Sequence, residues 1–340
     1  MGESITIDRR SLLKGCLALG AGAACAYSFI PPRTSVKGWC PKVSRVAVLK
    51  AESYSERLDQ ILMEGLNLFK LDVRGKSVLL KPNLVEYLPG KEVNTHPSLV
   101  GAAAECFLHL GAKKVVVGEG PGHQRDTQLL LWQSGLEAQL KHRRVDFVDL
   151  NCDELNKTRL KTNYTGLDHL WLPRSVLESD FVVSMPKVKT HHWAGVTLSM
   201  KNMFGIVPGL KYGWPKNILH WKGINESILD ICATLRIQLV IVDGIVGMEG
   251  NGPLHGEKRN LGVIVIGDDP VAADATVARL MGLRPERVQH LLVAGGFLGN
   301  LHSKKIRQLG EPVGQLRQIF RVPPGFSYLS SEVDSWQFLS

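Results

Sequence analysis

The sequence predicts an α/β protein in which a mostly parallel sheet, flanked by helices, is divided between two lobes around a cleft. First, apolar strand-like runs alternate with helical runs from residue 45 onward, as in successive β-α-β units. Second, runs such as 115–117 and 263–265 are apolar without a break, which is typical of strands covered on both faces. Third, a chain of 340 residues exceeds the size at which a single core normally stops growing.

The first half of the chain follows the strand-helix alternation closely. Residues 45–49 are strand-like, and 55–69 carry leucines and an isoleucine at helical spacing. The further elements predicted here are a strand at 77–80, a helix at 99–110, a strand at 113–117, a helix at 127–140 and a strand at 145–150. We assign this half, residues 45–165, to an N-terminal α/β lobe.

The second half resumes the alternation after a looser stretch. Its predicted elements are a strand at 181–184, a helix at 225–235, strands at 238–242 and 262–266, and a helix at 271–281. They define a C-terminal α/β lobe at 166–300. Residues 301–340 lose the alternation, so we expect them to form a peripheral tail.

Residues 1–30 have the features of an export signal. The pair Arg9-Arg10 precedes a short apolar run, 15–26, which is too short to span a membrane. This arrangement resembles the twin-arginine export signal, although Asp8 and Leu12 depart from the usual pattern. The resemblance implies passage through the twin-arginine translocase and a periplasmic or extracytoplasmic product, tethered to the membrane if the signal is retained.

The composition narrows the class of partner. The chain has 41 Lys and Arg against 32 Asp and Glu, a formal charge of +9. This excess fits either an anionic partner or a basic solvated surface. Because the sequence has no RNP-type aromatic motif, zinc-finger spacing or basic heptad helix, we expect no nucleic-acid partner. The cysteines beyond the signal are too far apart in sequence for a zinc ribbon or an iron–sulfur run.

Five predicted strands end in polar or glycine-rich loops. The loops are 81–83, 118–123, 185–192, 243–253 and 267–270. In open parallel sheets, ligands bind beyond the carboxyl ends of the strands, so these loops predict one site. Each loop alone is equally consistent with a turn, and Asp269 before Pro270 is also typical of a helix N-cap.

The loops supply the candidate catalytic and binding residues. Clustered lysines can pair with an anionic substrate or act as bases or nucleophiles, histidine can transfer protons, and carboxylates can act as bases. The candidate catalytic residues are Lys187, Lys189, His191, Lys201, Asp243 and Glu249. The candidate substrate-binding residues are Lys81, Asn83, Gly120, Gly122, Asn202 and Asn251. The alternative for each lysine is a solvated surface position.

A divalent or transition metal is a candidate cofactor. The candidate ligands are His96, His191 and Glu249, which would have to be assembled from separate loops because no pair has the helical i, i+4 spacing.

The same loops resemble the uncharacterised domain-of-unknown-function family 362 (DUF 362). The resemblance covers about residues 45–285, and its most specific blocks are 186–191 and 249–253. Exported relatives with twin-arginine signals are common, and some relatives carry a ferredoxin-like segment. This chain lacks that cysteine run, so we expect no iron–sulfur cluster. The architecture is also loosely similar to the nickel-dependent lactate racemases, whose site combines a lysine and histidines around a bound cofactor.

Together, these observations predict an exported enzyme that acts on a small carboxylate or phosphate in a cleft rich in lysine and histidine, with or without a metal. The alternative is a non-catalytic periplasmic binding protein or an accessory protein of a redox enzyme.

Overall fold

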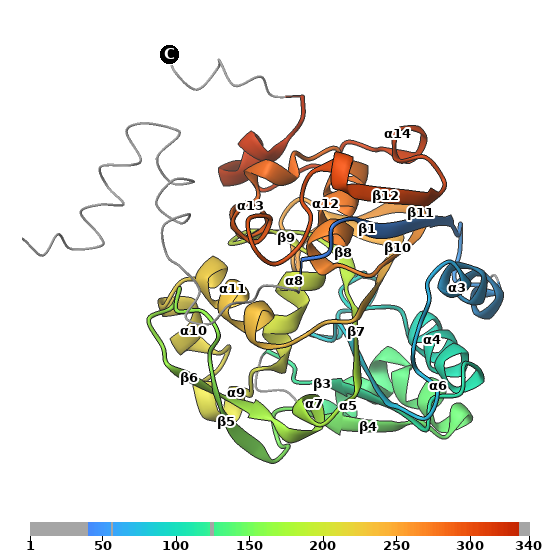
Figure 1. Ribbon diagram of the computed structural model, residues 1–340, viewed down its shortest axis with the longest axis vertical. Helices are drawn as coiled ribbons and strands as arrows, with labels where there is room; N and C mark the ends of the chain where they lie inside the picture. Colours follow the sequence, from blue (N-terminus) through green and yellow to red (C-terminus); the bar gives the residue numbers. More distant parts are fainter. Residues whose placement is uncertain (1–39, 56, 123–125, 333–340) are drawn as a thin grey trace, which may run out of the picture.

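The computed structural model describes residues 40–55, 57–122 and 126–332, and its centre is a ten-stranded sheet (Figure 1). The predicted signal segment therefore lies outside the described residues. Eight strands follow one another across the sheet in the order β12 (Ile306–Gly310), β1 (Ser44–Lys50), β11 (Glu257–Gly267), β10 (Leu239–Glu249), β7 (Phe181–Met185), β2 (Ser77–Pro82), β3 (Lys114–Glu119) and β4 (Asp146–Asp149).

The sheet is mostly parallel, as predicted. Strand β11 pairs antiparallel with both β1 and β10, while β10, β7, β2, β3 and β4 pair in parallel from one to the next. Strand β8 (Lys187–His191) follows β7 after Pro186 and pairs in parallel with β10, and β9 (Gly195–Thr197) pairs antiparallel with β8. Strands β5 (Leu155–Arg159) and β6 (His169–Pro173) form a separate hairpin.

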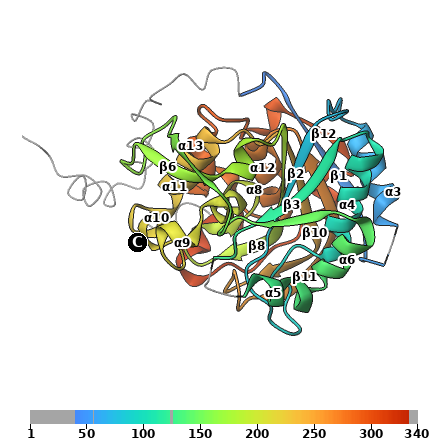
Figure 2. The same cartoon turned by 90° about the horizontal axis from the view of Figure 1, so that it is seen from below.

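The unbroken apolar runs are explained by burial on both faces of the sheet. In β10, Leu239 and Ile241 belong to one hydrophobic cluster, and the alternate residues Val240 and Val242 belong to another. In Figures 1 and 2, helices α3 (Leu58–Asn67), α4 (Pro97–His109) and α6 (Leu136–Arg143) lie on one side of the sheet. Helices α8 (Ser199–Asn202), α11 (Ile224–Thr234) and α12 (Pro270–Leu280) lie on the other.

Most predicted helices and strands are confirmed within a few residues, with one break. The helix expected at 127–140 is two helices, α5 (Thr127–Ser134) and α6, because Gly135 between them has a φ of 77°. Such a left-handed conformation ends one helix and redirects the chain.

The remaining helices are short. They are α7 (Arg174–Leu177), α9 (Gly209–Tyr212), α10 (Asn217–Trp221), α13 (Gln289–Ala294) and α14 (Val313–Leu316), with 3₁₀ turns η1 (Met203–Ile206), η2 (Pro285–Arg287), η3 (Ser303–Lys305) and η4 (Pro324–Leu329).

Two predicted loops are continuous strand instead. The residues expected to leave the sheet at 187–191 form β8, and Asp243 lies inside the eleven-residue strand β10. The two strands pair there, with Asp243 opposite Lys187 and Met248 opposite Lys189. Asp269 is the N-cap of α12, accepting hydrogen bonds from the first backbone N–H groups of the helix, as its position before Pro270 indicates.

The two predicted lobes share the one sheet. Strands β2, β3 and β4 come from 45–165, and β7, β10 and β11 come from 166–300. The predicted peripheral tail also contributes to it, because β12 pairs in parallel with β1. Phe320, in the same predicted tail, is buried in the hydrophobic core and only 2% exposed. Within the described ranges, no helix combines the length and apolar character that crossing a bilayer requires.

Candidate functional site

A pocket of about 470 Å³ opens at the carboxyl ends of β2, β3 and β8 and at the end of α8. This is the carboxyl edge of the parallel strands, where ligands of such sheets bind. The pocket is lined by Asn83, Leu84, Val85, Glu119, Gly120, Gly122, Lys189, His191, His192, Trp193, Thr197, Lys201, Asn202, Phe204, Gly205, Pro215, Lys216, His220, Asn251, Pro253, Leu254 and His255.

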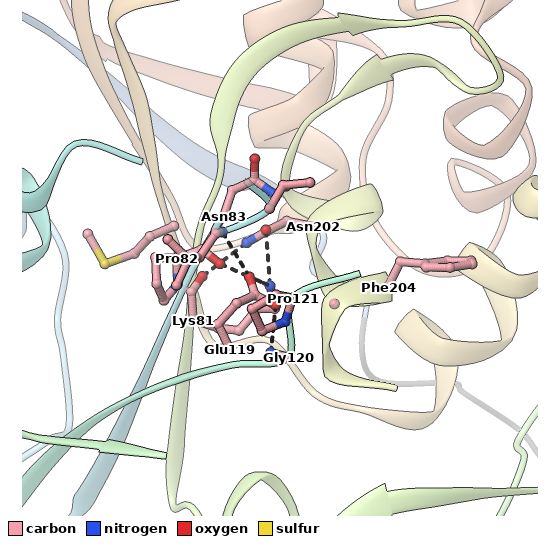
Figure 3. Close-up of polar contacts among 12 residues, drawn as sticks. Lys81, Pro82, Asn83, Glu119, Gly120, Pro121, Asn202 and Phe204 are labelled. Atoms are coloured by element: carbon pink, nitrogen blue, oxygen red, sulfur yellow. Dashed lines mark hydrogen bonds and ion pairs between the residues drawn. The ribbon is translucent and has the colours of Figure 1, made fainter. Parts of the chain in front are cut away.

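The floor of the pocket is a buried ion pair between Lys81 and Glu119 (Figure 3). Lys81 Nζ also donates to Asn202 Oδ1 at 3.2 Å and to the carbonyl of Pro82 at 2.9 Å. Asn202 Nδ2 donates in turn to the Lys81 carbonyl at 3.0 Å, so the ends of β2, β3 and α8 are joined. Burial lowers the pKa of Lys81, although Glu119 acts in the opposite direction.

Glu119 has both of its carboxylate oxygens occupied. Besides Lys81, Oε2 accepts from the backbone N–H of Leu84 at 3.2 Å, and Oε1 accepts from that of Gly120 at 2.9 Å. A Cβ on Gly205 would collide with Glu119 Oε1 and would lie 2.6 Å from Lys81 Nζ. Only glycine therefore lets the backbone at position 205 pack against this ion pair. The arrangement makes Glu119 an anchor for Lys81.

Lys216 closes one wall of the pocket. Its Nζ donates to three backbone carbonyls, those of Gly120 at 2.9 Å, Gly205 at 3.0 Å and Phe204 at 3.3 Å. The side chain is 2% exposed, and burial lowers its pKa to about 7. Nothing in the sequence marks Lys216 as a site residue, because it lies in an irregular segment before α10 with neither a periodic pattern nor a strand end.

Lys189 is the deepest lysine of the lining. It points from β8 under the segment that precedes α4, where Nζ donates to the carbonyl of Val93 at 2.7 Å. The side chain is fully buried, and burial together with the charges of Lys201 and Lys187 holds its pKa well below the usual range.

Lys201 differs from the other pocket lysines in having no fixed acceptor. Among the residues that the structure describes, none accepts a hydrogen bond from its Nζ or pairs with it, and the ammonium lies 4.6 Å from the centroid of the Phe204 ring. The helix that carries Lys201 is anchored, because Asp274 accepts from the backbone N–H groups of Ser199 and Met200 at the start of α8. Burial, with a contribution from the charge of Lys81, lowers the pKa of Lys201 to about 8.

Two histidines of the lining differ in which ring nitrogen carries the proton. His191 Nδ1 accepts from the backbone N–H groups of Trp193 and Ala194 at 3.0 and 3.2 Å, which leaves Nε2 as the protonated nitrogen of the neutral ring. Burial and Lys201 hold the pKa of His191 well below its usual range. His220 Nδ1 lies 3.3 Å from the carbonyl of Lys216 and donates to it, so its Nε2 is the unprotonated nitrogen. Burial lowers the pKa of His220 to about 4.

Two buried polar atoms of the lining have no partner within the described chain. Thr197 Oγ1 and Asn83 Oδ1 belong to side chains that are 4% and 8% exposed, and neither makes a hydrogen bond. Buried polar atoms are normally hydrogen-bonded, so two unsatisfied atoms in one pocket indicate a ligand position.

A second buried network lies outside this pocket and contains three of the predicted site residues. Lys187 Nζ donates to Asp243 Oδ2 at 3.2 Å and to the Tyr54 hydroxyl at 2.7 Å, and it forms an ion pair with Glu92 at 3.5 Å. Asp243 also accepts from Tyr54 at 2.7 Å and from the backbone N–H of His96 at 2.8 Å. Burial and the charge of Asp243 raise the pKa of Tyr54, so its phenol is neutral in this network.

The candidate metal ligands do not meet. His96 stacks on Tyr54 in the second network, with ring centroids 3.7 Å apart, whereas His191 lies in the pocket. Glu249 accepts from Arg321 Nε at 2.8 Å and from its backbone N–H at 3.1 Å. In the part of the chain that the structure describes, no three His, Cys, Asp or Glu side chains group closely enough to hold a metal ion.

The structure thus gathers most of the predicted site residues and separates the rest. The pocket lining includes Lys189, His191, Lys201, Asn83, Gly120, Gly122, Asn202 and Asn251, with Lys81 bonded to its floor. Lys187, Asp243 and His96 lie in the second network, and Glu249 is bonded to Arg321. Like Lys216, Thr197 is a lining residue that the sequence does not mark, because a β-branched residue in a strand gives no functional signal.

Comparison with known proteins identifies a family and a relative. Residues 78–279 match the model of the family described as Domain of unknown function (DUF362), a span that contains every residue lining the pocket. Thylakoid-associated protein sll1697 of Synechocystis sp. is 29% identical over 262 residues, which is 72% of this chain and 77% of that protein.

Two solved structures are similar to this chain over part of their length. A protein of Thermotoga maritima is 14% identical with a TM-score of 0.34, covering 56% of this chain and 50% of that one. The lactate racemase apoprotein of Thermoanaerobacterium thermosaccharolyticum is 11% identical with a TM-score of 0.39, covering 67% of this chain and 54% of that one. This chain therefore spans about half the length of either protein.

Proposed function

The chain belongs to the family described as Domain of unknown function (DUF362), and we propose that it is an enzyme that binds a small carboxylate or phosphate in the pocket above Glu119. The observation that carries the proposal is the imbalance of charge in the lining. Lys189, Lys201 and Lys216 face a pocket whose one described carboxylate, Glu119, is already paired with Lys81.

An anion would relieve this imbalance. Desolvated ammonium groups close to one another disfavour their own protonation, which is why the lysines of the lining have lowered pKa values. A bound carboxylate or phosphate would supply the missing negative charge and draw protons back onto them. The His191 Nε2–H and the unpartnered Thr197 hydroxyl add neutral donors for its oxygens.

Catalysis, beyond binding alone, is favoured by amines that can change protonation state near neutral pH. The pKa of Lys201 is about 8 and that of Lys216 is about 7, values suited to general acid–base work. A binding protein needs only charged lysines, for which ordinary pKa values suffice. We therefore favour an enzyme, and we assign to Lys201 the role of the acid–base group or nucleophile.

Export is part of the proposal and is supported by the sequence. The Arg9-Arg10 pair and the apolar run after it would direct the folded protein to the periplasm or another extracytoplasmic space. Replacing both arginines by lysine should leave the protein in the cytoplasm, as judged by fractionation. Export of that double variant at the normal level would remove this part of the proposal.

The test of the binding site compares thermal unfolding with and without phosphate and lactate. Either anion should raise the midpoint of the wild-type protein, and Lys201→Gln should lose most of that shift. Lys211→Gln is the matched control, because Lys211 also lies over an aromatic ring, that of Trp171, but is exposed and outside the pocket. A shift that is absent in the wild type, or equal in both variants, would refute the proposal.

A further inference from the structure

The lysines around the pocket are not equivalent in their hydrogen bonding. Lys81 is bound to Glu119, Lys189 to the carbonyl of Val93, and Lys216 to three carbonyls. Each of these amines is oriented by its acceptors. Lys201 Nζ, by contrast, has no acceptor among the described residues and rests against the Phe204 ring.

We propose that Lys201 is a nucleophile that forms an imine with the substrate, so that the substrate is a small anion bearing an aldehyde or ketone carbonyl. This inference rests on the proposed function and narrows its substrate class to 2-oxo acids and phosphorylated carbonyl compounds. An acceptor on Nζ would hold the amine's proton in place and oppose its loss. The absence of one leaves the nitrogen able to present its lone pair to the pocket.

The bond changes are those of a simple condensation. The unprotonated Nζ forms a bond to the carbonyl carbon, and the π electrons of the C=O bond move to the oxygen. The two protons of the amine move to that oxygen, which leaves as water while the nitrogen lone pair forms the C=N bond. No oxidant, reductant or metal is consumed, and water is the second product.

The surroundings of Lys201 supply the groups that this condensation needs. Its charge is close enough to lower the pKa values of both His191 and His220. The His191 Nε2–H can stabilise negative charge on the carbonyl oxygen, and the unprotonated Nε2 of His220 can carry protons from nitrogen to oxygen. Lys189 and Lys216 remain to attract the carboxylate or phosphate through their charge.

The lowered pKa supports the geometric argument. At a pKa of about 8, a sizeable fraction of Lys201 is unprotonated at neutral pH. Each step of one in pKa changes the unprotonated fraction of an amine about tenfold under these conditions. A lysine with the usual value of 10.5 would be almost entirely protonated.

The experiment treats the full protein with pyruvate or pyridoxal phosphate, reduces with borohydride, and maps the modified lysines by peptide mass spectrometry. Lactate and inorganic phosphate are the matched anions without a reactive carbonyl. We expect reduced adduct at Lys201 with both carbonyl probes, at a level about tenfold or more above that at exposed Lys211. Lys201→Arg should remove the adduct, and Lys211→Arg should keep it.

The outcomes separate this inference from the proposed function. If lactate or phosphate raises the unfolding midpoint but neither carbonyl probe modifies Lys201 above the level at Lys211, the imine is refuted and the anion site stands. If none of the four compounds stabilises the protein, both proposals fall. Mapping the adduct in the unmutated protein makes the result independent of how well the Lys201→Arg variant folds.

Discussion

Replacing Lys201 by methionine should stabilise the unliganded protein. The substitution keeps an unbranched chain of similar length against Phe204 and removes the amine. Because none of the described groups accepts a hydrogen bond from Nζ, the change leaves no buried acceptor without a donor. What it removes is a charge held among other lysines, a state kept for function at the expense of stability.

The magnitude follows from the shift in pKa. Lowering the pKa of Lys201 from 10.5 to about 8 corresponds to about 3 kcal/mol against the protonated folded state. Because the side chain is partly exposed in the pocket, solvent screening reduces the expected gain to about 1–2 kcal/mol at pH 7.

The stability gained by Lys201→Met should decrease as the pH rises. Below a pH of about 8, Lys201 is protonated in both the folded and unfolded states, so the full penalty is present. Between about 8 and 10.5, the unfolded chain holds the proton that the folded protein has released, and wild-type stability rises with pH. The advantage of Lys201→Met should therefore be largest at pH 7 and vanish above 10.5.

Urea unfolding at pH 7 and at pH 10, followed by circular dichroism, measures this difference directly. Lys211→Met is the control and should change the free energy of unfolding by no more than about 0.5 kcal/mol at either pH. A Lys201→Met protein that is less stable than wild type at pH 7, or whose advantage is the same at both values, would refute the reasoning.

Three further substitutions test the remaining assignments. Asp243→Asn should lower the free energy of unfolding in urea by about 3 kcal/mol, because it removes the fully buried carboxylate paired with Lys187 and leaves Glu92 as its ion-pair partner. The phosphate-induced thermal shift should persist; loss of the shift with unchanged stability would place Asp243 in the site. Gly205→Ala should lower the free energy of unfolding by about 1–3 kcal/mol and weaken the phosphate-induced thermal shift, because the added Cβ displaces the floor of the pocket. Gly314→Ala is the control: its Cβ would meet open space, so it should change neither quantity. Glu249→Gln should lower the free energy of unfolding by about 1 kcal/mol, because its partner Arg321 is 67% exposed. The phosphate-induced thermal shift should stay intact. A shift abolished at unchanged stability would contradict a purely structural role for Glu249.

The sequence predicted the class of fold well because apolar periodicity is a local property. The strands at 77–82 and 114–119 and the helix at 270–280 lie close to their expected positions, and the polar residues at the ends of β2 and β3 do border a pocket. The break at Gly135 was missed, since a lone glycine within a helical pattern does not by itself specify a left-handed conformation.

The division of the candidate residues between two sites depends on the covering chain. Lys187 and Lys189 are two apart on β8, and alternation along a strand puts them on the same face. The segment before α4 passes over both, so Glu92 pairs with Lys187 while the Val93 carbonyl accepts from Lys189. These contacts, together with those of Asp243 and Tyr54 to Lys187, assign one lysine to a buried network and the other to the pocket.

By itself, therefore, the sequence determined that this protein is built on a mostly parallel sheet with polar groups at the ends of its strands. The tertiary structure decided which of those groups meet: it brought Lys216 to the carbonyl of Gly120, just after β3, and to those of η1, joined Glu249 to Arg321, and left Lys201 without an acceptor among the described residues. The physical reason is that hydrophobic periodicity reports on neighbours a few residues apart. The protonation and reactivity of a side chain depend instead on burial and on partners that are often more than fifty residues away, as for Glu249 and Arg321, which are 72 apart.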